Sequence, residues 1–159
     1  MENVKAKTPA KESALVYDAK EKILGRLASQ VAKELLNGKN ISIINAEQAV
    51  ITGDKEMLKA KYTTRMRLKE KANPEHSPYW SRRPDMLVKR IVRGMLPYRM
   101  PRGKAAFKRL RVYMGVPETL RSTKAIEVDT KSPKVLYVKS TTVLELVKLL
   151  GYNDNTSKK

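Results

Sequence analysis

The amino-acid sequence predicts an α/β fold with parallel strands. Two observations support this prediction: the elements expected between residues 14 and 58 follow the order strand, helix, strand, strand, helix, and the apolar residues of the first helix repeat with helical spacing. A chain of 159 residues with 41% hydrophobic residues is large enough for one core. We expect a single domain at residues 13–151, with flexible tails at residues 1–12 and 152–159.

The first elements come from short apolar runs and one periodic segment. Residues 14–17 are apolar and include a β-branched and an aromatic side chain, which is typical of a buried strand. Apolar residues from Leu24 to Leu36 repeat at helical spacing, and Gly38 is the expected end of this helix. Residues 41–44 predict the second strand.

The following segment predicts a third short strand at residues 49–51, closed by a Thr-Gly-Asp turn. Asp54 is the expected N-cap of a helix that begins near Lys55. Residues 62–83 show no clear period and contain an Asn-Pro and a Ser-Pro loop, so we expect irregular structure there.

Two short helices are expected next. Ser81 precedes a helix with Pro84 in its first turn, and a second short helix spans residues 102–110. Residues 112–114 then read as a strand that ends at a glycine.

The C-terminal part predicts two further elements. Residues 135–138 indicate a late strand or a buried extended segment. Thr142 and Glu145 match the capping-box pattern, which predicts a last helix that reaches Gly151.

The net charge of +18 comes from 34 basic and 16 acidic residues. It is concentrated in residues 59–111, which hold 17 basic and 3 acidic residues, whereas residues 1–58 hold 9 and 8. Such an excess predicts a polyanionic partner, first of all nucleic acid. The same segment contains five of the eight prolines and five of the nine aromatic residues, so stiff loops and rings accompany the basic side chains.

Composition also excludes several classes of protein. The chain has no cysteine, which excludes disulfides and thiolate metal sites and fits the reducing cytoplasm, where we expect the protein to act. Its apolar runs are too short to span a membrane, and its polar first residues lack the apolar core of a signal peptide.

The strongest motif is the turn between the two short helices, residues 92–104. Gly94 and Gly103 permit a close backbone approach, and Pro97 and Pro101 hold the turn rigid, so that its basic side chains lose less entropy on binding. Arginine guanidinium groups can fork onto phosphate oxygens. We therefore expect this turn to contact nucleic acid; a plain solvated basic surface is the other interpretation.

Two further basic motifs precede it in the chain. Basic residues alternate with other residues between Arg65 and Lys71, which places them on one side of an extended segment. Arg82 and Arg83 precede a helix start, where backbone N–H groups also favour phosphate. Trp80, beside them, is more often a packing residue than a platform for a base.

Together these motifs predict an RNA-binding set of basic side chains. The set consists of Arg65, Arg67, Lys69, Lys71, Arg82, Arg83, Lys89, Arg90, Arg93, Arg99, Arg102, Lys104, Lys108, Arg109 and Arg111.

No catalytic or metal site is expected, and no cofactor. His76 is the only histidine, and helix capping explains Asp18 and Asp54 without catalysis. No nucleophile and base can be paired from the sequence. Two alternatives stay open: an enzyme that acts on RNA or a nucleotide, and a DNA-packaging protein.

Ordered motifs across residues 14–150 resemble a known family. They are Gly94-Met95-Leu96-Pro97, Gly103-Lys104, residues 110–115, and, in the N-terminal half, residues 23–29, 44–46 and 52–53. At this spacing they resemble the large-subunit ribosomal protein L-thirteen family (universal uL-thirteen), and its archaeal branch in particular.

The resemblance implies a three-layer α/β/α fold on a four-stranded parallel sheet, with basic helical and loop extensions. It implies a non-enzymatic structural constituent of the large ribosomal subunit that binds 23S-type rRNA and supports subunit assembly. Its partners would be this rRNA and neighbouring large-subunit ribosomal proteins, with no membrane and no small-molecule substrate. Within the motif, Arg93, Arg99, Arg102 and Lys104 match the RNA-facing stretch of the family.

Overall fold

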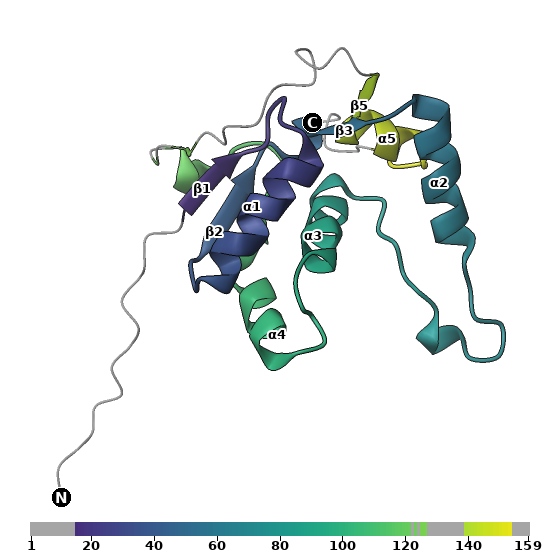
Figure 1. The fold of residues 1–159 in the computed structure, drawn as a ribbon. Helices are drawn as coiled ribbons and strands as arrows, with labels where there is room; N and C mark the ends of the chain where they lie inside the picture. Colours follow the sequence, from purple (N-terminus) through teal and green to yellow (C-terminus); the bar gives the residue numbers. More distant parts are fainter. Residues whose placement is uncertain (1–14, 122, 124, 127–138, 154–159) are drawn as a thin grey trace, which may run out of the picture.

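Three short strands form a parallel sheet. The structure is a computed structural model that describes residues 15–121, 123, 125–126 and 139–153. Strands β1 (Leu15–Asp18), β2 (Ile41–Ile44) and β4 (Leu110–Val112) lie in the order β1-β2-β4. Leu15 pairs with Ile41, and Ile41 in turn with Leu110. The predicted α/β class with parallel strands is therefore confirmed (Figure 1).

The third predicted strand does not join this sheet. Strand β3 (Val50–Thr52) pairs antiparallel with β5 (Ser140–Thr142) as a separate two-stranded sheet. Only residues 45–49 connect β2 to β3, and parallel neighbours need a crossover of a dozen or more residues. In place of the four-stranded parallel sheet that was expected, the described residues thus form a three-stranded parallel sheet and an antiparallel pair.

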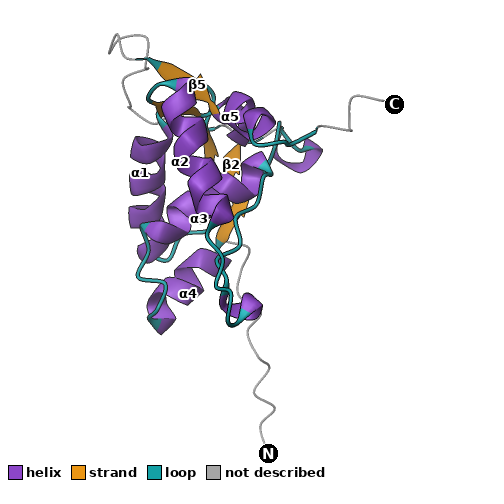
Figure 2. Ribbon diagram, turned by 90° about the vertical axis from the view of Figure 1, so that its right-hand side faces the viewer, coloured by secondary structure: helices purple, strands orange, loops and turns teal. Residues whose placement is uncertain are grey.

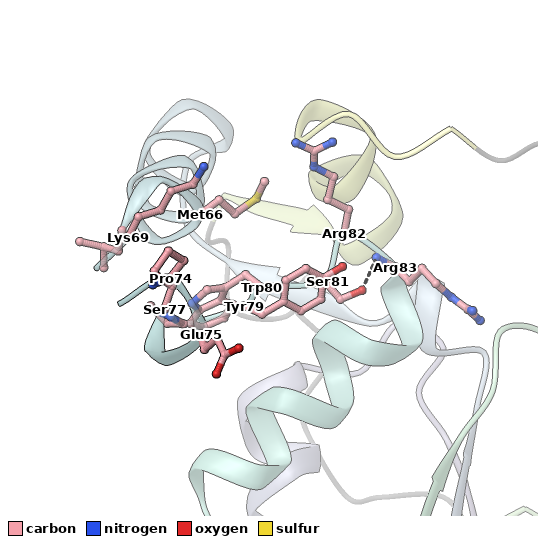
Figure 3. Close-up of a pocket in the computed structure, with 12 residues that line it drawn as sticks. Met66, Lys69, Pro74, Glu75, Ser77, Tyr79, Trp80, Ser81, Arg82 and Arg83 are labelled. Atoms are coloured by element: carbon pink, nitrogen blue, oxygen red, sulfur yellow. Dashed lines mark hydrogen bonds between the residues drawn. The ribbon is translucent and has the colours of Figure 1, made fainter. Parts of the chain in front are cut away.

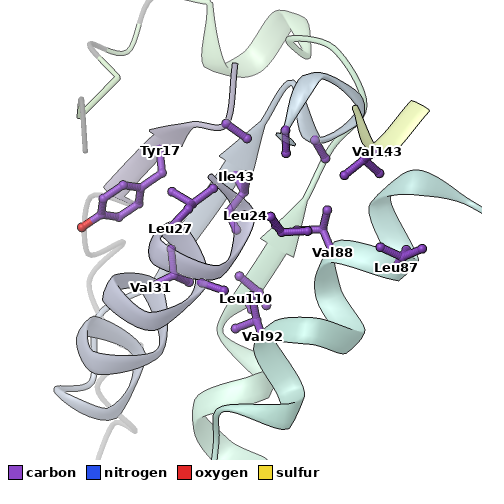
Figure 4. Packing of buried hydrophobic residues seen from close by; sticks show 14 of the residues in the cluster. Tyr17, Leu24, Leu27, Val31, Ile43, Leu87, Val88, Val92, Leu110 and Val143 are labelled. Carbon is purple, nitrogen blue, oxygen red and sulfur yellow. The ribbon is translucent and has the colours of Figure 1, made fainter. Parts of the chain in front are cut away.

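Helices α1 (Leu24–Leu36) and α3 (Pro84–Gly94) pack on each other and on one face of the parallel sheet. Leu27 and Val31 of α1 and Val88 of α3 are fully buried against the strands (Figure 4). Seen from the side in Figure 2, α1 lies on one side of β2 with α3 next to it. The periodicity predicted this helix pair correctly, and Gly38, with a φ of 94°, ends α1 as expected.

Helix α2 (Lys55–Arg67) is much longer than the sequence indicated. Its buried stripe is narrow, with Leu58, Tyr62 and the partly buried Met66 one turn apart. Thr64 is tolerated inside the helix because its hydroxyl donates a hydrogen bond to the Ala60 carbonyl oxygen, 3.0 Å away. The prediction of an extended segment from Arg65 onward was therefore wrong for its first residues.

The remaining helices are short. Helix α4 (Pro101–Lys108) follows α3 after a tight turn, and α5 (Val143–Leu149) follows β5 directly. Single 3-10 turns are present at η1 (Ala46–Gln48), η2 (Pro74–His76) and η3 (Glu118–Leu120). The predicted cap of α5 is present, since the Thr142 hydroxyl accepts a hydrogen bond from the Glu145 backbone N–H at 3.2 Å.

Some expectations fall outside what the structure describes. The strand predicted at residues 135–138 lies outside the described residues, as do most residues of both predicted tails. Among the described residues, no helix is long and apolar enough to cross a membrane.

Candidate nucleic-acid interface

Trp80 is the centre of one aromatic–cation cluster. The guanidinium carbon of Arg90, on α3, lies 4.0 Å from the centroid of the indole ring, and that of Arg65, on α2, lies 5.1 Å from it. The Tyr62 ring meets Trp80 edge-on, with the ring centroids 6.1 Å apart. Trp80 is partly buried against the core, so its expected packing role is confirmed.

A second cluster connects α3 to α4. Tyr98 and Phe107 meet at right angles with their centroids 5.4 Å apart. The guanidinium carbon of Arg93 lies 4.9 Å from the Tyr98 centroid, and the Lys89 ammonium nitrogen lies 5.2 Å from the Phe107 centroid. Each such contact is worth about 0.5–1 kcal/mol at an exposed site and leaves the N–H donors of the cation free for another acceptor.

The two clusters are joined along one side of α3. Lys89, Arg90, Arg93 and Phe107 line a shared hollow of about 220 Å³ together with Tyr79, Ser81 and Met86. Partial burial lowers the pKa of Arg90, and the positive charges of Arg93 and Arg65 lower it further. The structure therefore brings cations from α2 and α3 to one surface, where they repel one another in the absence of an anion.

The turn between α3 and α4 is held rigid by its own backbone. A Cβ on Gly103 would lie 2.1 Å from the Pro97 carbonyl oxygen, so only glycine fits there, whereas Gly94 has open space around it. The close approach expected of Gly103 is thus made to the protein's own turn and not to a ligand. Arg99, Arg102 and Lys104 are all exposed on this turn and the first turn of α4.

The predicted basic side chains are almost all without acidic partners. Of the fifteen, only Arg83 forms an ion pair in the described part of the chain, with its Nη2 2.9 Å from Asp85 Oδ2. The other ion pairs between described residues, Lys39 with Glu34 and Lys139 with Asp54, involve no predicted site residue. Apart from Arg83, the basic side chains of residues 59–111 thus have no ion-pair partner among the described residues.

Two predicted residues are placed apart from this surface. Arg109 is partly buried, and its Nη2 donates a hydrogen bond to the Leu35 carbonyl oxygen at the end of α1, 2.9 Å away. Arg111 is exposed but lies on β4 between Leu110 and Val112, so its side chain leaves the sheet on the face opposite to α1 and α3.

The basic residues after Tyr62 are divided between two elements. Arg65 and Arg67 belong to the last turn of α2, where residues two apart point roughly 200° away from each other. Lys69 and Lys71 are exposed in the loop that follows. The expectation that these four share one side of an extended segment was wrong. Lys59 and Lys61, two further basic residues of this segment, are exposed on α2.

A larger open hollow lies between the end of α2 and the start of α3. Its volume is about 920 Å³, and its lining includes Met66, Lys69, Tyr79, Trp80 and Arg82 (Figure 3). In Figure 3 the Arg82 side chain extends toward α5, away from that of Arg83. Lys108 does not line this hollow; it is exposed at the C-terminal end of α4.

The carboxylates considered for catalysis have structural partners. Asp18 Oδ1 accepts hydrogen bonds from the Lys20 backbone N–H and from Asn45 Nδ2, each at 2.9 Å. Asp54 is the N-cap residue of α2, which begins at Lys55 as predicted, although its side chain makes no capping hydrogen bond. Asp18 is not the N-cap of α1, whose N-cap residue is Ile23. No group of His, Asp and Glu residues in the described ranges could hold a metal ion, and His76 is exposed.

The fold and this basic surface can be compared with known proteins. The family model described as ribosomal protein L13 matches residues 12–119. The chain belongs to the ribosomal protein L13 family. It is therefore classed with ribosomal constituents and not with enzymes, and the family expected from the motifs is confirmed.

Relatives in three archaea are each named large ribosomal subunit protein uL13. That of Archaeoglobus fulgidus is 45% identical over 139 residues, covering 86% of this chain and 87% of its own. That of Methanocaldococcus jannaschii is 46% identical over 138 residues, and that of Methanosphaera stadtmanae 43% over 137, each covering 86% of this chain and 96% of the relative. The similarity therefore extends over almost the whole length of these relatives.

Proposed function

We propose that this protein binds the 23S-type rRNA of the large ribosomal subunit and supports assembly of that subunit. The binding surface consists of Arg65 and Arg67, the loop with Lys69, Lys71 and Arg82, the α3 residues Lys89, Arg90 and Arg93, and Arg99, Arg102, Lys104 and Lys108 of the turn and α4. Neighbouring large-subunit proteins are its other partners. The family and the names of its relatives support this assignment.

One observation carries the proposal. Arg65, Arg90, Arg93 and Lys89 are held in place by aromatic faces instead of carboxylates. Their cationic groups lie 4.0–5.2 Å from the centroids of three rings, those of Trp80, Tyr98 and Phe107. An aromatic face restricts a guanidinium group without neutralising it, so its charge and donors stay available for phosphate. A carboxylate partner would cancel that charge.

The mechanism is electrostatic and geometric. Folded rRNA brings phosphates of separate segments close together, and each neutralised phosphate removes repulsion that opposes this packing. The deep major groove of A-form RNA is closed to side chains, so recognition depends mainly on the shape of the backbone. A rigid turn between α3 and α4 suits such recognition because little entropy is lost when its cations are engaged.

The test removes three charges from the turn. Arg93, Arg99 and Arg102 are replaced by Ala together, and binding to large-subunit rRNA is measured over a range of salt concentrations. Each phosphate contact contributes a log–log slope of about −0.7 to −0.9, so the triple variant should bind more weakly and with a flatter slope. An unchanged slope would exclude this turn from the interface.

A matched control separates position from net charge. Replacing Lys20, Arg26 and Lys55 with Ala also removes three exposed cations, but outside residues 59–111. This variant should retain the slope and affinity of the unmodified protein.

Binding of duplex DNA as tightly as rRNA at matched salt would favour a DNA-packaging role instead.

A further inference from the structure

Tyr79 is the most exposed large apolar or aromatic side chain in the part of the chain that the structure describes. Its side chain is 81% exposed, although it adjoins Trp80 at the edge of the 920 Å³ hollow. Exposure of an aromatic ring to this extent costs apolar hydration free energy that burial would recover. The exposed face of the Tyr79 ring is therefore available to a ligand.

The two adjacent rings, Tyr79 and Trp80, differ in the contacts that they make. The Trp80 indole is in contact with the guanidinium groups of Arg65 and Arg90 and with the edge of Tyr62. Tyr79 makes no ring or cation contact with any described residue. Trp80 is thus committed to packing inside the protein, while the face of Tyr79 is available for stacking.

The backbone that carries Tyr79 is fixed by side chains. Arg90 Nη1 donates a hydrogen bond to the Tyr79 carbonyl oxygen. The Ser77 hydroxyl, two residues before Tyr79, accepts one from the Glu70 backbone N–H at 2.9 Å, which closes residues 70–77 of the same loop. A ring on such a braced loop loses less conformational entropy when it binds than one on a free loop.

The charges around the ring indicate which kind of ligand fits. Lys69 and Arg82 line the same hollow, are exposed, and have no carboxylate within ion-pair distance among the described residues. Glu75 is the one acidic residue of its lining. A free aromatic face next to unpaired cations matches an unpaired nucleotide, which combines a π-face with a phosphate.

We propose that Tyr79 stacks on an unpaired nucleobase of the bound RNA, while Lys69 and Arg82 neutralise the flanking phosphates. This inference rests on the proposed function, because it assigns a single-stranded subsite within the same RNA interface. Stacking accepts any base, since every base has a π-face. The subsite therefore selects unpaired over paired RNA and not one sequence over another.

The experiment uses the full-length protein with two probes, an unstructured adenine-rich RNA and a blunt RNA duplex. Tyr79→Ala should weaken binding of the unstructured RNA roughly tenfold, the usual size of a lost base–aromatic stack. Because no charge is removed, the salt slope should not change. Affinity for the duplex should also remain the same. Tyr79→Phe, which keeps the ring, should bind both probes like the unmodified protein.

Two further variants complete the test. Met57→Ala removes an exposed apolar side chain of α2 outside the hollow and should alter neither affinity. Lys69→Ala combined with Arg82→Ala should flatten the slope for the unstructured RNA by about 1.4, at about 0.7 per phosphate. A slope unchanged by this pair would exclude the phosphate contacts.

The outcomes distinguish the subsite from the interface as a whole. If Tyr79→Ala binds unstructured RNA as well as the unmodified protein does, or loses duplex binding equally, the subsite is overturned. The proposed function then still stands on the slope of the Arg93, Arg99 and Arg102 variant. If the unmodified protein binds neither probe with salt dependence, both proposals fail.

Discussion

Gly103 lies so close to Pro97 that a Cβ on Gly103 would be 2.1 Å from the Pro97 carbonyl oxygen and 2.4 Å from its carbonyl carbon. Both obstacles are backbone atoms, which cannot rotate away like the end of a side chain. This contact sets the angle at which α4 leaves the turn. It therefore also sets where Arg99, Arg102 and Lys104 stand relative to α3.

Gly103→Ala should destabilise the protein by about 2 kcal/mol or more, because the turn must move to make room. Gly94→Ala is the matched control: Gly94 ends α3 in open space, and Ala there should stabilise the helix by about 0.5–1 kcal/mol. Urea unfolding of both variants measures these changes. Equal stabilities would show that the turn yields easily.

Arg109→Ala should lower stability by about 1.5–3 kcal/mol, the usual worth of a hydrogen bond to a charged group. The variant loses the bond from Arg109 Nη2 to the Leu35 carbonyl oxygen and a positive charge at the C-terminal end of α1. Lys108→Ala, one residue away and exposed, should change stability by less than about 0.5 kcal/mol. Thermal unfolding separates the two; a similar small effect for both would contradict a structural role for Arg109.

Trp80→Leu should weaken RNA binding without changing its salt dependence. The substitution leaves Arg65 and Arg90 charged but removes the ring that restricts them, so their ordering becomes a cost of binding. Trp80→Phe keeps an aromatic face, so its affinity for RNA should lie between that of Trp80→Leu and that of the unmodified protein. Binding titrations at several salt concentrations provide the measurement. If Trp80→Leu and Trp80→Phe bind RNA with the same affinity, the ring does not position these cations.

The sequence predicts elements best where burial repeats strongly. Helix α1 could be placed because its core side chains, among them Leu27, Val31 and Leu35, recur along one face. Helix α2 buries essentially one side chain per turn, so its continuation to Arg67 left little periodic signal. The pairing of β3 with β5 joins segments about ninety residues apart, and local pattern carries no information about such a partner.

The candidate site could be predicted by composition but not by geometry. Charge counting indicated residues 59–111 as the binding segment. The glycines of the turn indicated a close backbone approach but not which group would lie against the backbone. Which ring holds which cation depends on tertiary packing, as with Arg90 on Trp80 and Lys89 on Phe107. For the same reason the internal bond of Arg109 and the outward direction of Tyr79 could not be inferred from neighbours in the chain.

Tyr62→Phe should reduce the loss of stability at alkaline pH. Burial raises the pKa of Tyr62 above its ordinary value of 10.0, and the nearby Arg65 guanidinium opposes this in part. Below pH 10 the ring is neutral in both states, and the full contribution of burial is present. As pH rises above 10 the unfolded chain ionises first, so stability falls until the pKa of the folded state is passed, by at most about 1.4 kcal/mol per pH unit.

The comparison is made by urea unfolding at pH 8 and at several values above 10, on the unmodified protein, Tyr62→Phe and Tyr79→Phe. Tyr62→Phe retains the ring packed against Trp80 and removes a hydroxyl that has no hydrogen-bond partner among the described residues. Its free energy of unfolding should equal that of the unmodified protein near neutrality and exceed it at high pH. Part of the loss of stability at alkaline pH should remain, because burial also raises the pKa of Tyr17. Tyr79→Phe removes the same group from an exposed ring and should follow the unmodified curve throughout. Parallel curves for all three proteins would mean that Tyr62 is not the group that titrates.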